Sequence, residues 1–361
     1  MGNPYLNAMF VVAGLACLLT ILLMIAERFL CNYGSCEIEI NDKKKFSVTG
    51  GQSLLDSLYE NEIFIPSACG GQGTCGYCKV RILEGAGAVL PTELPYLTDD
   101  EIATSTRLAC QVKVKQNMKL RIREDFLNVQ QYAGTVASAR MISADTREII
   151  IRLSAPAEME FCAGQYVQIE VPNSNERISR AYSICNPPSR KNEIELLVKK
   201  IPEGLGSTYM HDLKVGASVS LTGAYGEFQL DPEAEIICIA GGCGMAPARS
   251  IVRQIAAENP QRKCWLFYGA RSENDALYYK EFCELEKQTP GLTVVYSLND
   301  VSGNPDRQGE AGFVHLAVDK HLRPTENAQV FLCGPPLMIE ATQKVLLEKQ
   351  IPQSKIFYDE F

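Results

Sequence analysis

A glycine-rich stretch with three cysteines, CGGQGTCGYC at residues 69–78, constrains the fold of this chain more than any other feature. Five residues separate Cys69 from Cys75, two separate Cys75 from Cys78, and a fourth cysteine, Cys110, follows after 31 further residues. Four glycines lie between the first three cysteines, and glycine allows the tight turns that aim backbone N–H groups at sulfur atoms. We therefore expect this loop to wrap a group that is held by thiolates.

The cysteine spacing favours one kind of metal centre over the others. A structural zinc site usually pairs two Cys-x2-Cys knuckles, whereas this chain has one knuckle, one cysteine before it and one remote cysteine. Plant-type [2Fe–2S] clusters use that arrangement, with four residues instead of five in the first gap. We predict a [2Fe–2S] cluster with zinc or free thiols as the alternatives. Its expected ligands are Cys69, Cys75, Cys78 and Cys110.

Residues 35–125 as a whole resemble a [2Fe–2S] ferredoxin domain with a β-grasp-like fold. The alternation of apolar and polar residues in CEIEIND predicts a hairpin that turns at Asn41-Asp42. Ser53 is expected to cap the short helix that follows.

The N-terminus carries no charged side chain from Met1 to Ala26, and residues 8–26 are apolar almost throughout. A run of about twenty such residues is the length of a transmembrane helix. A cleaved signal peptide would need a basic start and a shorter core, so we predict one membrane span in residues 1–34, with a buried core helix as the alternative. Basic residues follow this run and none precedes it, which places the downstream domains on the cytoplasmic side of the inner membrane.

Composition limits the partners. The net charge is −8 and the longest basic block is Lys43–Lys45, so a nucleic-acid partner is not expected. The fourteen cysteines are spread along the whole chain and many lie in apolar, strand-like segments, which indicates a reducing compartment.

Residues 126–230 are rich in strand patterns and contain two motifs, RAYS at residues 180–183 and GLGST at residues 204–208. A helix that opens after glycine offers free N–H groups to an anion. Together the motifs resemble the antiparallel β-barrel flavin domain of the ferredoxin–NADP reductase superfamily; a generic barrel is the alternative. The resemblance implies that Arg180 pairs with the FAD pyrophosphate, that Tyr182 packs on the isoalloxazine and that Ser183 reaches flavin N5. It also implies phosphate contacts from Gly206, Ser207 and Thr208.

Residues 231–361 alternate strands and helices, as in a parallel α/β domain that binds its ligand at the carboxyl ends of the strands. The motifs GGCGMAP and CGPPLM resemble the NAD(P) domain of the same superfamily. The resemblance implies that Gly241, Gly242, Gly244 and Pro247 approach the pyrophosphate. Cys333, Gly334 and Pro335 would then lie at the nicotinamide, with Cys333 either a reactive thiol or a small side chain that positions the ring. Catalytic roles are thus expected for Tyr182, Ser183 and Cys333.

The order of the parts forms one electron path, because NADH gives up a hydride, a cluster takes single electrons, and FAD handles both. The domain order and the motifs LPTEL, RLACQV, RAYS, YGARS and the terminal YDEF resemble the electron-input subunits of the sodium-translocating NADH:quinone oxidoreductase family. That resemblance implies FAD, a [2Fe–2S] cluster and NADH as cofactors, ubiquinone as acceptor, other integral-membrane subunits as partners, and Phe361 as a cover for the flavin. That family typically has a long insertion before Arg180, where this chain has a short loop.

NADH is expected as the donor rather than NADPH. The acidic Glu273 and Asp275 would repel a 2′-phosphate, Arg271 and Ser272 would attract one, and the resemblance favours NADH. Two rival functions remain: the NADH-dependent reductase component of a mono- or dioxygenase, and a membrane-anchored electron carrier with little NADH turnover.

Overall fold

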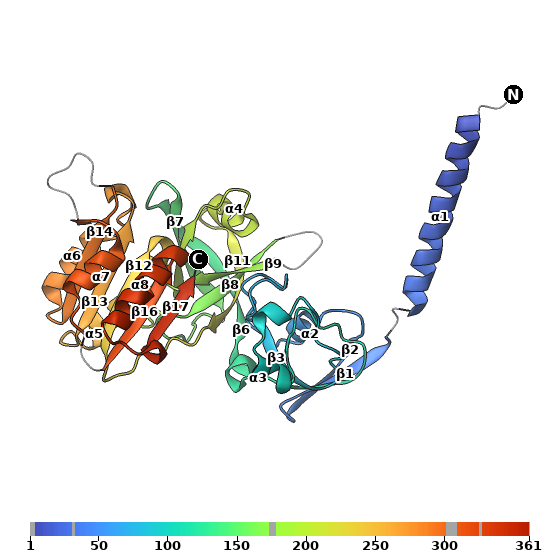
Figure 1. The fold of residues 1–361 in the computed structure, drawn as a ribbon, viewed down its shortest axis with the longest axis horizontal. Coiled ribbons are helices and arrows are strands. Elements are labelled where there is room, and N and C mark those ends of the chain that lie inside the picture. The colour runs from blue at the N-terminus through green and yellow to red at the C-terminus, as the bar shows by residue number, and fades with distance from the viewer. Residues whose placement is uncertain (1–3, 31–32, 173–177, 301–308, 325–326, 361) are drawn as a thin grey trace. The chain divides into compact units, whose positions relative to one another are not determined.

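The computed structural model describes residues 4–30, 33–172, 178–300, 309–324 and 327–360. The chain divides into two compact units, residues 1–128 and 129–361, and each is described by itself. The first unit holds a long helix and a five-stranded sheet, and the second holds a six-stranded barrel and a six-stranded parallel sheet (Figure 1).

The apolar N-terminal run forms helix α1 over Pro4–Leu30, a length of 27 residues. The described side chains of its middle, among them Phe10, Leu15 and Leu22, are exposed. The side chains at residues 4–8, 11, 23 and 25–30 lie outside the description. Within the described residues, no helix is both long and apolar enough to cross a membrane.

The rest of the first unit is a mixed sheet in the strand order β2-β1-β5-β3-β4, with β1 parallel to β5. The predicted hairpin is present, and both Asn41 and Asp42 adopt the left-handed conformation in its turn. Ser53 caps helix α2 as expected, because its hydroxyl accepts the N–H of Asp56 at 3.1 Å. The elements are β1 (Ser35–Ile40), β2 (Lys44–Thr49), α2 (Leu54–Glu60), β3 (Lys79–Glu84), α3 (Asp99–Ala103), β4 (Thr106–Leu108) and β5 (Met118–Arg121), with short turns η1 (Leu94–Tyr96) and η2 (Glu124–Asn128).

The second unit begins with an antiparallel barrel in the order β10-β7-β6-β11-β8-β9. A single bridge between Ile184 and Leu196 joins the end of β9 to β10 and closes the sheet. Inward residues such as Ile149, Ile151 and Val167 fill the barrel. The elements are β6 (Gln130–Met141), β7 (Thr146–Ala155), β8 (Tyr166–Val171), β9 (Ile178–Ser183), β10 (Glu193–Lys199), α4 (Leu205–Asp212) and β11 (Ser218–Tyr225).

The nucleotide-binding part is a parallel sheet in the order β15-β14-β13-β12-β16-β17, with helices on both faces (Figure 1). Along β12, Cys238 packs with α5 and α6, whereas Ile237 and Ile239 pack with α7 and α8. The strand order reverses at β12, which is where open α/β sheets bind ligands. The elements are β12 (Glu235–Gly241), η3 (Gly242–Gly244), α5 (Met245–Glu258), β13 (Cys264–Ala270), η4 (Glu273–Asp275), α6 (Tyr279–Gln288), β14 (Leu292–Leu298), β15 (Glu310–Ala311), α7 (Val314–His321), β16 (Ala328–Gly334), α8 (Pro336–Glu348), η5 (Gln353–Lys355) and β17 (Ile356–Glu360).

Candidate functional sites

The four predicted cluster ligands come together in the first unit as two pairs of thiols. Strands β3 and β4 pair antiparallel, and the N–H of Ala109 donates to the carbonyl of Cys78 at 2.8 Å. This pairing brings the sulfur atoms of Cys78 and Cys110 to 3.3 Å. Within the loop, the sulfur atoms of Cys69 and Cys75 lie 3.4 Å apart. The four loop glycines all adopt positive φ angles, at 67° for Gly70, 88° for Gly71, 74° for Gly73 and 71° for Gly76.

Each thiol pair favours one thiolate. The Cys75 thiol donates to Cys69 and, together with N–H groups of Thr74 and Gln72, lowers the pKa of Cys69 to about 4. In the second pair, the Cys78 thiol donates to Cys110 and lowers the pKa of Cys110 to about 7. The donor thiols are correspondingly held protonated, because hydrogen bonding and burial raise the pKa values of Cys75 and Cys78.

This arrangement fits a two-iron cluster. Each iron of a [2Fe–2S] centre takes two protein thiolates, and the structure supplies two pairs on a loop whose N–H groups face sulfur. Among the residues that the structure describes, no group of three or more His, Cys, Asp or Glu side chains is poised around a single metal ion.

A buried ion pair supports the segment that precedes the fourth cysteine. Arg107 and Glu93 are almost fully buried and form hydrogen bonds at 3.0 Å between Nε and Oε1 and at 2.5 Å between Nη2 and Oε2. Glu93 also accepts the N–H groups of Leu90 and Leu108 at 2.9 Å each. Sequence reasoning placed both residues within motifs and gave neither of them a role. The signal that could have identified this ion pair was Arg107, a charged residue that directly precedes the apolar Leu108 and Ala109.

The barrel brings together the two motifs expected to bind FAD. Arg180, Tyr182 and Ser183 lie on or at the end of β9, and Gly206 lies in the first turn of α4. A Cβ atom at Gly206 would come within 2.5 Å of Arg180 Cγ and 3.1 Å of Tyr182 Oη, so only glycine leaves room there. The close approach forms a cradle between a cation, an aromatic ring and a helix start, which fits a flavin nucleotide.

In the same cradle, the start of helix α4 has no side-chain cap, the Ser207 hydroxyl has backbone partners, and the Tyr182 phenol is neutral. No side chain caps the start of α4, which leaves that end of the helix to face an anion. The Ser207 hydroxyl instead bonds to the backbone of the preceding turn, accepting from Ile201 N at 3.1 Å and donating to Gly204 O at 3.1 Å. Burial raises the pKa of Tyr182 to about 12, so its phenol stays neutral.

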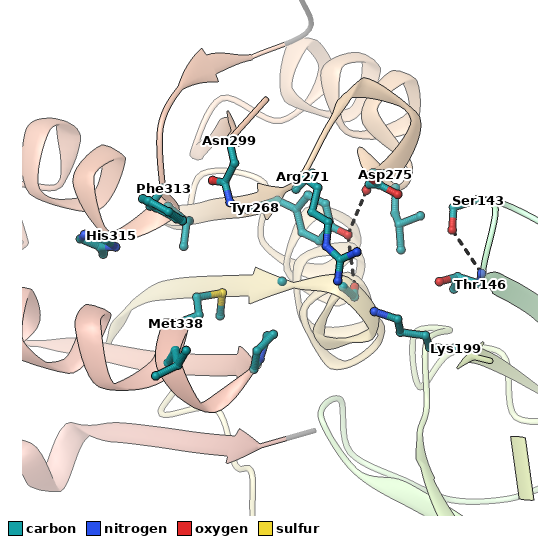
Figure 2. A pocket seen from close by; sticks show the side chains of 18 of the residues that line it. Ser143, Thr146, Lys199, Tyr268, Arg271, Asp275, Asn299, Phe313, His315 and Met338 are labelled. Atoms are coloured by element: carbon teal, nitrogen blue, oxygen red, sulfur yellow. Dashed lines mark hydrogen bonds between the residues drawn. The ribbon is translucent and has the colours of Figure 1, made fainter. Parts of the chain in front are cut away.

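A cavity of about 470 Å³ lies at the carboxyl ends of the strands of the parallel sheet (Figure 2). Gly241, Gly242 and Pro335 line it, as expected for a dinucleotide site. Figure 2 shows Arg271 and Lys199 pointing toward each other across the cavity, a cationic arrangement that suits a phosphate group. At the other end, Phe313 and His315 line the cavity, and their rings stack with centres 5.8 Å apart, which offers a flat surface to a base.

The remaining residues expected at the nicotinamide and pyrophosphate are buried behind this cavity. A Cβ atom on Gly244 would overlap the carbonyl oxygen of Cys333, so the two motifs touch only because residue 244 is glycine. Burial raises the pKa of the Cys333 thiol, which favours a neutral side chain over a reactive thiolate. Pro247 and Gly334 are buried as well, and Phe361 lies outside the described residues.

The barrel contributes to the dinucleotide cavity through residues that the sequence did not single out. Ser143, Asp145, Thr146 and Lys199 all line the cavity from β7, β10 and the turn before β7. No local motif marks them, because folding alone brings them opposite β12. On the nucleotide side, Asp275 lines the cavity and accepts the Ser272 hydroxyl at 2.9 Å.

Three family models match the chain. Residues 38–115 match the 2Fe-2S iron-sulfur cluster binding domain, residues 133–230 the oxidoreductase FAD-binding domain, and residues 238–344 the oxidoreductase NAD-binding domain. These matches confirm the three cofactors and the order of their domains.

Curated relatives cover nearly the whole chain. The F subunit of the Na⁺-translocating NADH-quinone reductase of Methylococcus capsulatus is 34% identical, over 93% of this chain and 94% of its own length. The protein of the same name in Neisseria gonorrhoeae is 33% identical, over 98% of each chain.

Solved structures share the fold. An Amycolatopsis cytochrome P450 reductase superposes with a TM-score of 0.73 at 29% identity, covering 90% of this chain and 98% of its own. The ferredoxin reductase of carbazole 1,9a-dioxygenase superposes with a TM-score of 0.69 at 28% identity, covering 91% and 98%.

Proposed function

Because the chain belongs to the family of F subunits of the Na⁺-translocating NADH-quinone reductases, we propose that it is the NADH-oxidising subunit of a membrane complex that reduces quinone and transports sodium. It is an oxidoreductase with NAD-, FAD- and [2Fe–2S]-binding domains. Electrons pass from NADH through FAD to the cluster. We also propose that the membrane acceptor is ubiquinone and that other integral-membrane subunits are the partners of this chain.

The observation that carries the proposal is the dinucleotide cavity shared by the barrel and the parallel sheet, in a chain that also pairs four thiols. Bound FAD supplies the conversion of a hydride into single electrons. The residues of this chain bind, orient and shield the reactants. Lys199 and Arg271 face the middle of the cavity, and the neutral Tyr182 lies against the start of α4.

The individual roles follow the motifs. Arg180 would pair with the pyrophosphate of bound FAD, the Tyr182 ring would pack on the isoalloxazine, and the Ser183 hydroxyl would approach N5. The start of α4, with Gly206, Ser207 and Thr208, faces the phosphates, mainly through backbone N–H groups because the Ser207 hydroxyl is bonded to its own turn.

On the nicotinamide nucleotide, the GGCGMAP turn approaches the pyrophosphate, through Gly241, Gly242, Gly244 and Pro247. The neutral Cys333, with Gly334 and Pro335, positions the ring. Cys69, Cys75, Cys78 and Cys110 would hold the cluster, and Phe361, which lies outside the described residues, would be the cover of the flavin. The domain boundaries in this proposal are 1–34, 35–125, 126–230 and 231–361.

The N-terminal helix serves as a single-pass anchor in the inner membrane, with the other domains in the cytoplasm. Its apolar run, residues 8–26, has no His, Asp, Glu, Lys or Arg, so it offers no group for an ion or proton relay. Anchoring raises the effective concentration of the cluster near acceptors in the membrane.

The rival function is supported by the two solved reductases, which are named for a cytochrome P450 and a carbazole dioxygenase. An experiment in membranes that lack this chain distinguishes the two functions. Adding back the full-length protein should restore NADH-driven quinone reduction and sodium uptake together. Efficient electron delivery to a soluble oxygenase, without restored quinone reduction, would establish the rival instead.

A further inference from the structure

A group of charged side chains with a buried centre joins the barrel to the nucleotide-binding part within the second unit. Its centre is Arg249 of α5, which is only 6% exposed. Arg249 Nη1 donates to Glu195 Oε2 of β10 at 2.5 Å, while Nε and Nη2 each bind one carboxylate oxygen of Glu281 at 3.0 Å. The guanidinium also lies 4.3 Å from the centre of the Tyr278 ring. These contacts fix both the position and the plane of the guanidinium.

Two further hydrogen bonds cross the same boundary. Tyr278 Oη donates to Glu148 Oε2 of β7 at 2.5 Å, and Ser250 Oγ donates to the carbonyl of Asn186 at 2.7 Å. We call Arg249, Glu195, Glu281, Tyr278 and Glu148 the Arg249 clamp.

On the barrel side, the residues that Arg249 contacts are close in sequence to the flavin motif and to a residue of the dinucleotide cavity. Cys185 follows Ser183 by two residues, and its sulfur lies 3.4 Å from Arg249 Nη1. Glu195 precedes Lys199 by four residues on the same strand, and Lys199 lines the dinucleotide cavity. A shift of the clamp would therefore move the flavin side of the reaction.

On the nucleotide side, two residues of the Arg249 clamp are likewise close in sequence to residues of the dinucleotide site. Arg249 follows Gly244 by five residues, and Gly244 is in the turn that touches Cys333. Tyr278 follows Asp275 by three residues, and Asp275 lines the cavity. Only a few residues of chain therefore separate the contacts of the Arg249 clamp from the flavin motif in the barrel and from the nucleotide-binding turn in the parallel α/β part.

Stability alone is a weak reason for such a group. Desolvation of a buried ion pair often exceeds its Coulombic gain, so apolar residues of equal volume would join the domains as firmly. A planar guanidinium that holds one carboxylate at two points adds a defined orientation that apolar packing lacks. Hydride transfer depends steeply on orientation, because a displacement of about 1 Å can lower a rate by about 10²-fold.

We propose that Arg249 is a positioning residue for hydride transfer, which acts by holding the nucleotide-binding part against the barrel at the distance that the reaction needs. The inference rests on the proposed NADH-to-FAD step, in which NADH loses two electrons and one hydrogen as hydride to become NAD⁺, and the flavin gains them. Arg249 itself is not among the residues that line the dinucleotide cavity.

Anaerobic stopped-flow reduction of the FAD-loaded full-length protein by NADH tests the proposal. The Arg249→Met variant keeps the volume and removes the charge, and we expect its reduction rate at saturating NADH to fall by about tenfold or more. The dissociation constant for NADH should change by less than about threefold, and the bound FAD content should stay the same. Arg249→Lys should recover part of the rate. Deuterium at C4 of NADH should slow the variant at least as much as the native protein, since hydride transfer remains the impaired step.

Arg262→Met is the matched control, because Arg262 binds backbone carbonyls, including that of Ala234 at 2.9 Å, away from the cavity. An unchanged rate in Arg249→Met, an effect confined to NADH affinity, or an equal loss in Arg262→Met would overturn the proposal. If Arg249→Met fails to fold, Glu281→Gln and Tyr278→Phe carry the same test with smaller losses. A native protein whose flavin is not reduced by NADH would instead refute the proposed function.

Discussion

Arg107, three residues before Cys110, binds both carboxylate oxygens of Glu93 through hydrogen bonds of 3.0 Å to Oε1 and 2.5 Å to Oε2. Arg107 also donates to the carbonyl of Gly87 at 3.0 Å, so the pair ties residues 86–93 to strand β4. A cluster ligand that follows β4 depends on that strand for its place.

Replacing Glu93 with Gln should destabilise the first unit. Arg107 would remain buried without a counter-charge, and breaking a buried pair on one side costs about 3–5 kcal/mol. Thermal loss of the visible iron–sulfur absorbance measures the effect. Glu124→Gln is the control, since its pair with Lys43 is exposed and should matter little. Equal melting of Glu93→Gln and the native protein would contradict this role for the pair.

The cluster ligands should be separable from the flavin site. Replacing Cys69, Cys75, Cys78 or Cys110 with Ser should bleach the visible iron–sulfur absorbance while FAD stays bound, because the two sites lie in different compact units. Cys36→Ser is the control: Cys36 is buried and its thiol donates to the carbonyl of Tyr33 at 3.6 Å. Loss of the cluster in Cys36→Ser together with its retention in Cys110→Ser would show that the ligand set is wrong.

The sequence predicted what local spacing determines. The Asn41-Asp42 turn, the Ser53 cap and the parallel α/β pattern are encoded within short segments, and the structure confirms them. The cavity residue Lys199 and the clamp residue Arg249 could not be predicted, because each acquires its partners from distant parts of the chain, as Arg249 does from Glu195 on strand β10 and from Glu281 on helix α6. The Ser207 hydroxyl shows the converse, since its motif suggested a phosphate contact and the fold bonds it to its own backbone.

The second unit should lose stability in acid through Glu148. Burial acts to raise the pKa of Glu148, but hydrogen bonds from Arg140 and Tyr278 outweigh burial and hold the pKa below the ordinary value of 4.5. The stabilisation by this carboxylate is therefore complete above about pH 4.5 and is lost as the pH falls through the lowered folded value. Urea unfolding, followed by the fluorescence of the single tryptophan Trp265, should show the advantage of the native protein over Glu148→Gln shrinking in that range. A constant difference across the range would refute the assignment.

NADH should be preferred to NADPH. The Asp275 carboxylate lines the cavity and would repel a 2′-phosphate, although Arg271 in the same cavity opposes this. Asp275→Asn should raise kcat/KM for NADPH by about tenfold relative to NADH, and Arg271→Gln should lower it. Steady-state kinetics with both nucleotides decides the matter. A native protein with the higher kcat/KM for NADPH would contradict the preference.

A truncated chain that begins at Ser35 should separate electron entry from delivery to the membrane. Strand β1 starts at Ser35, so the cut removes helix α1 and leaves the cysteine loop, the barrel and the parallel sheet intact. We expect this protein to remain in solution, to bind FAD and a [2Fe–2S] cluster, and to pass electrons from NADH to a small artificial acceptor at the native rate. In membranes that lack the full-length chain, it should fail to support quinone reduction, because the anchor no longer concentrates the cluster near its acceptor. Full-length protein added to the same membranes is the control. If the truncated chain reduced quinone as fast as the assembled membranes, helix α1 would have no part in delivery and the proposed role of this chain in electron entry would be wrong.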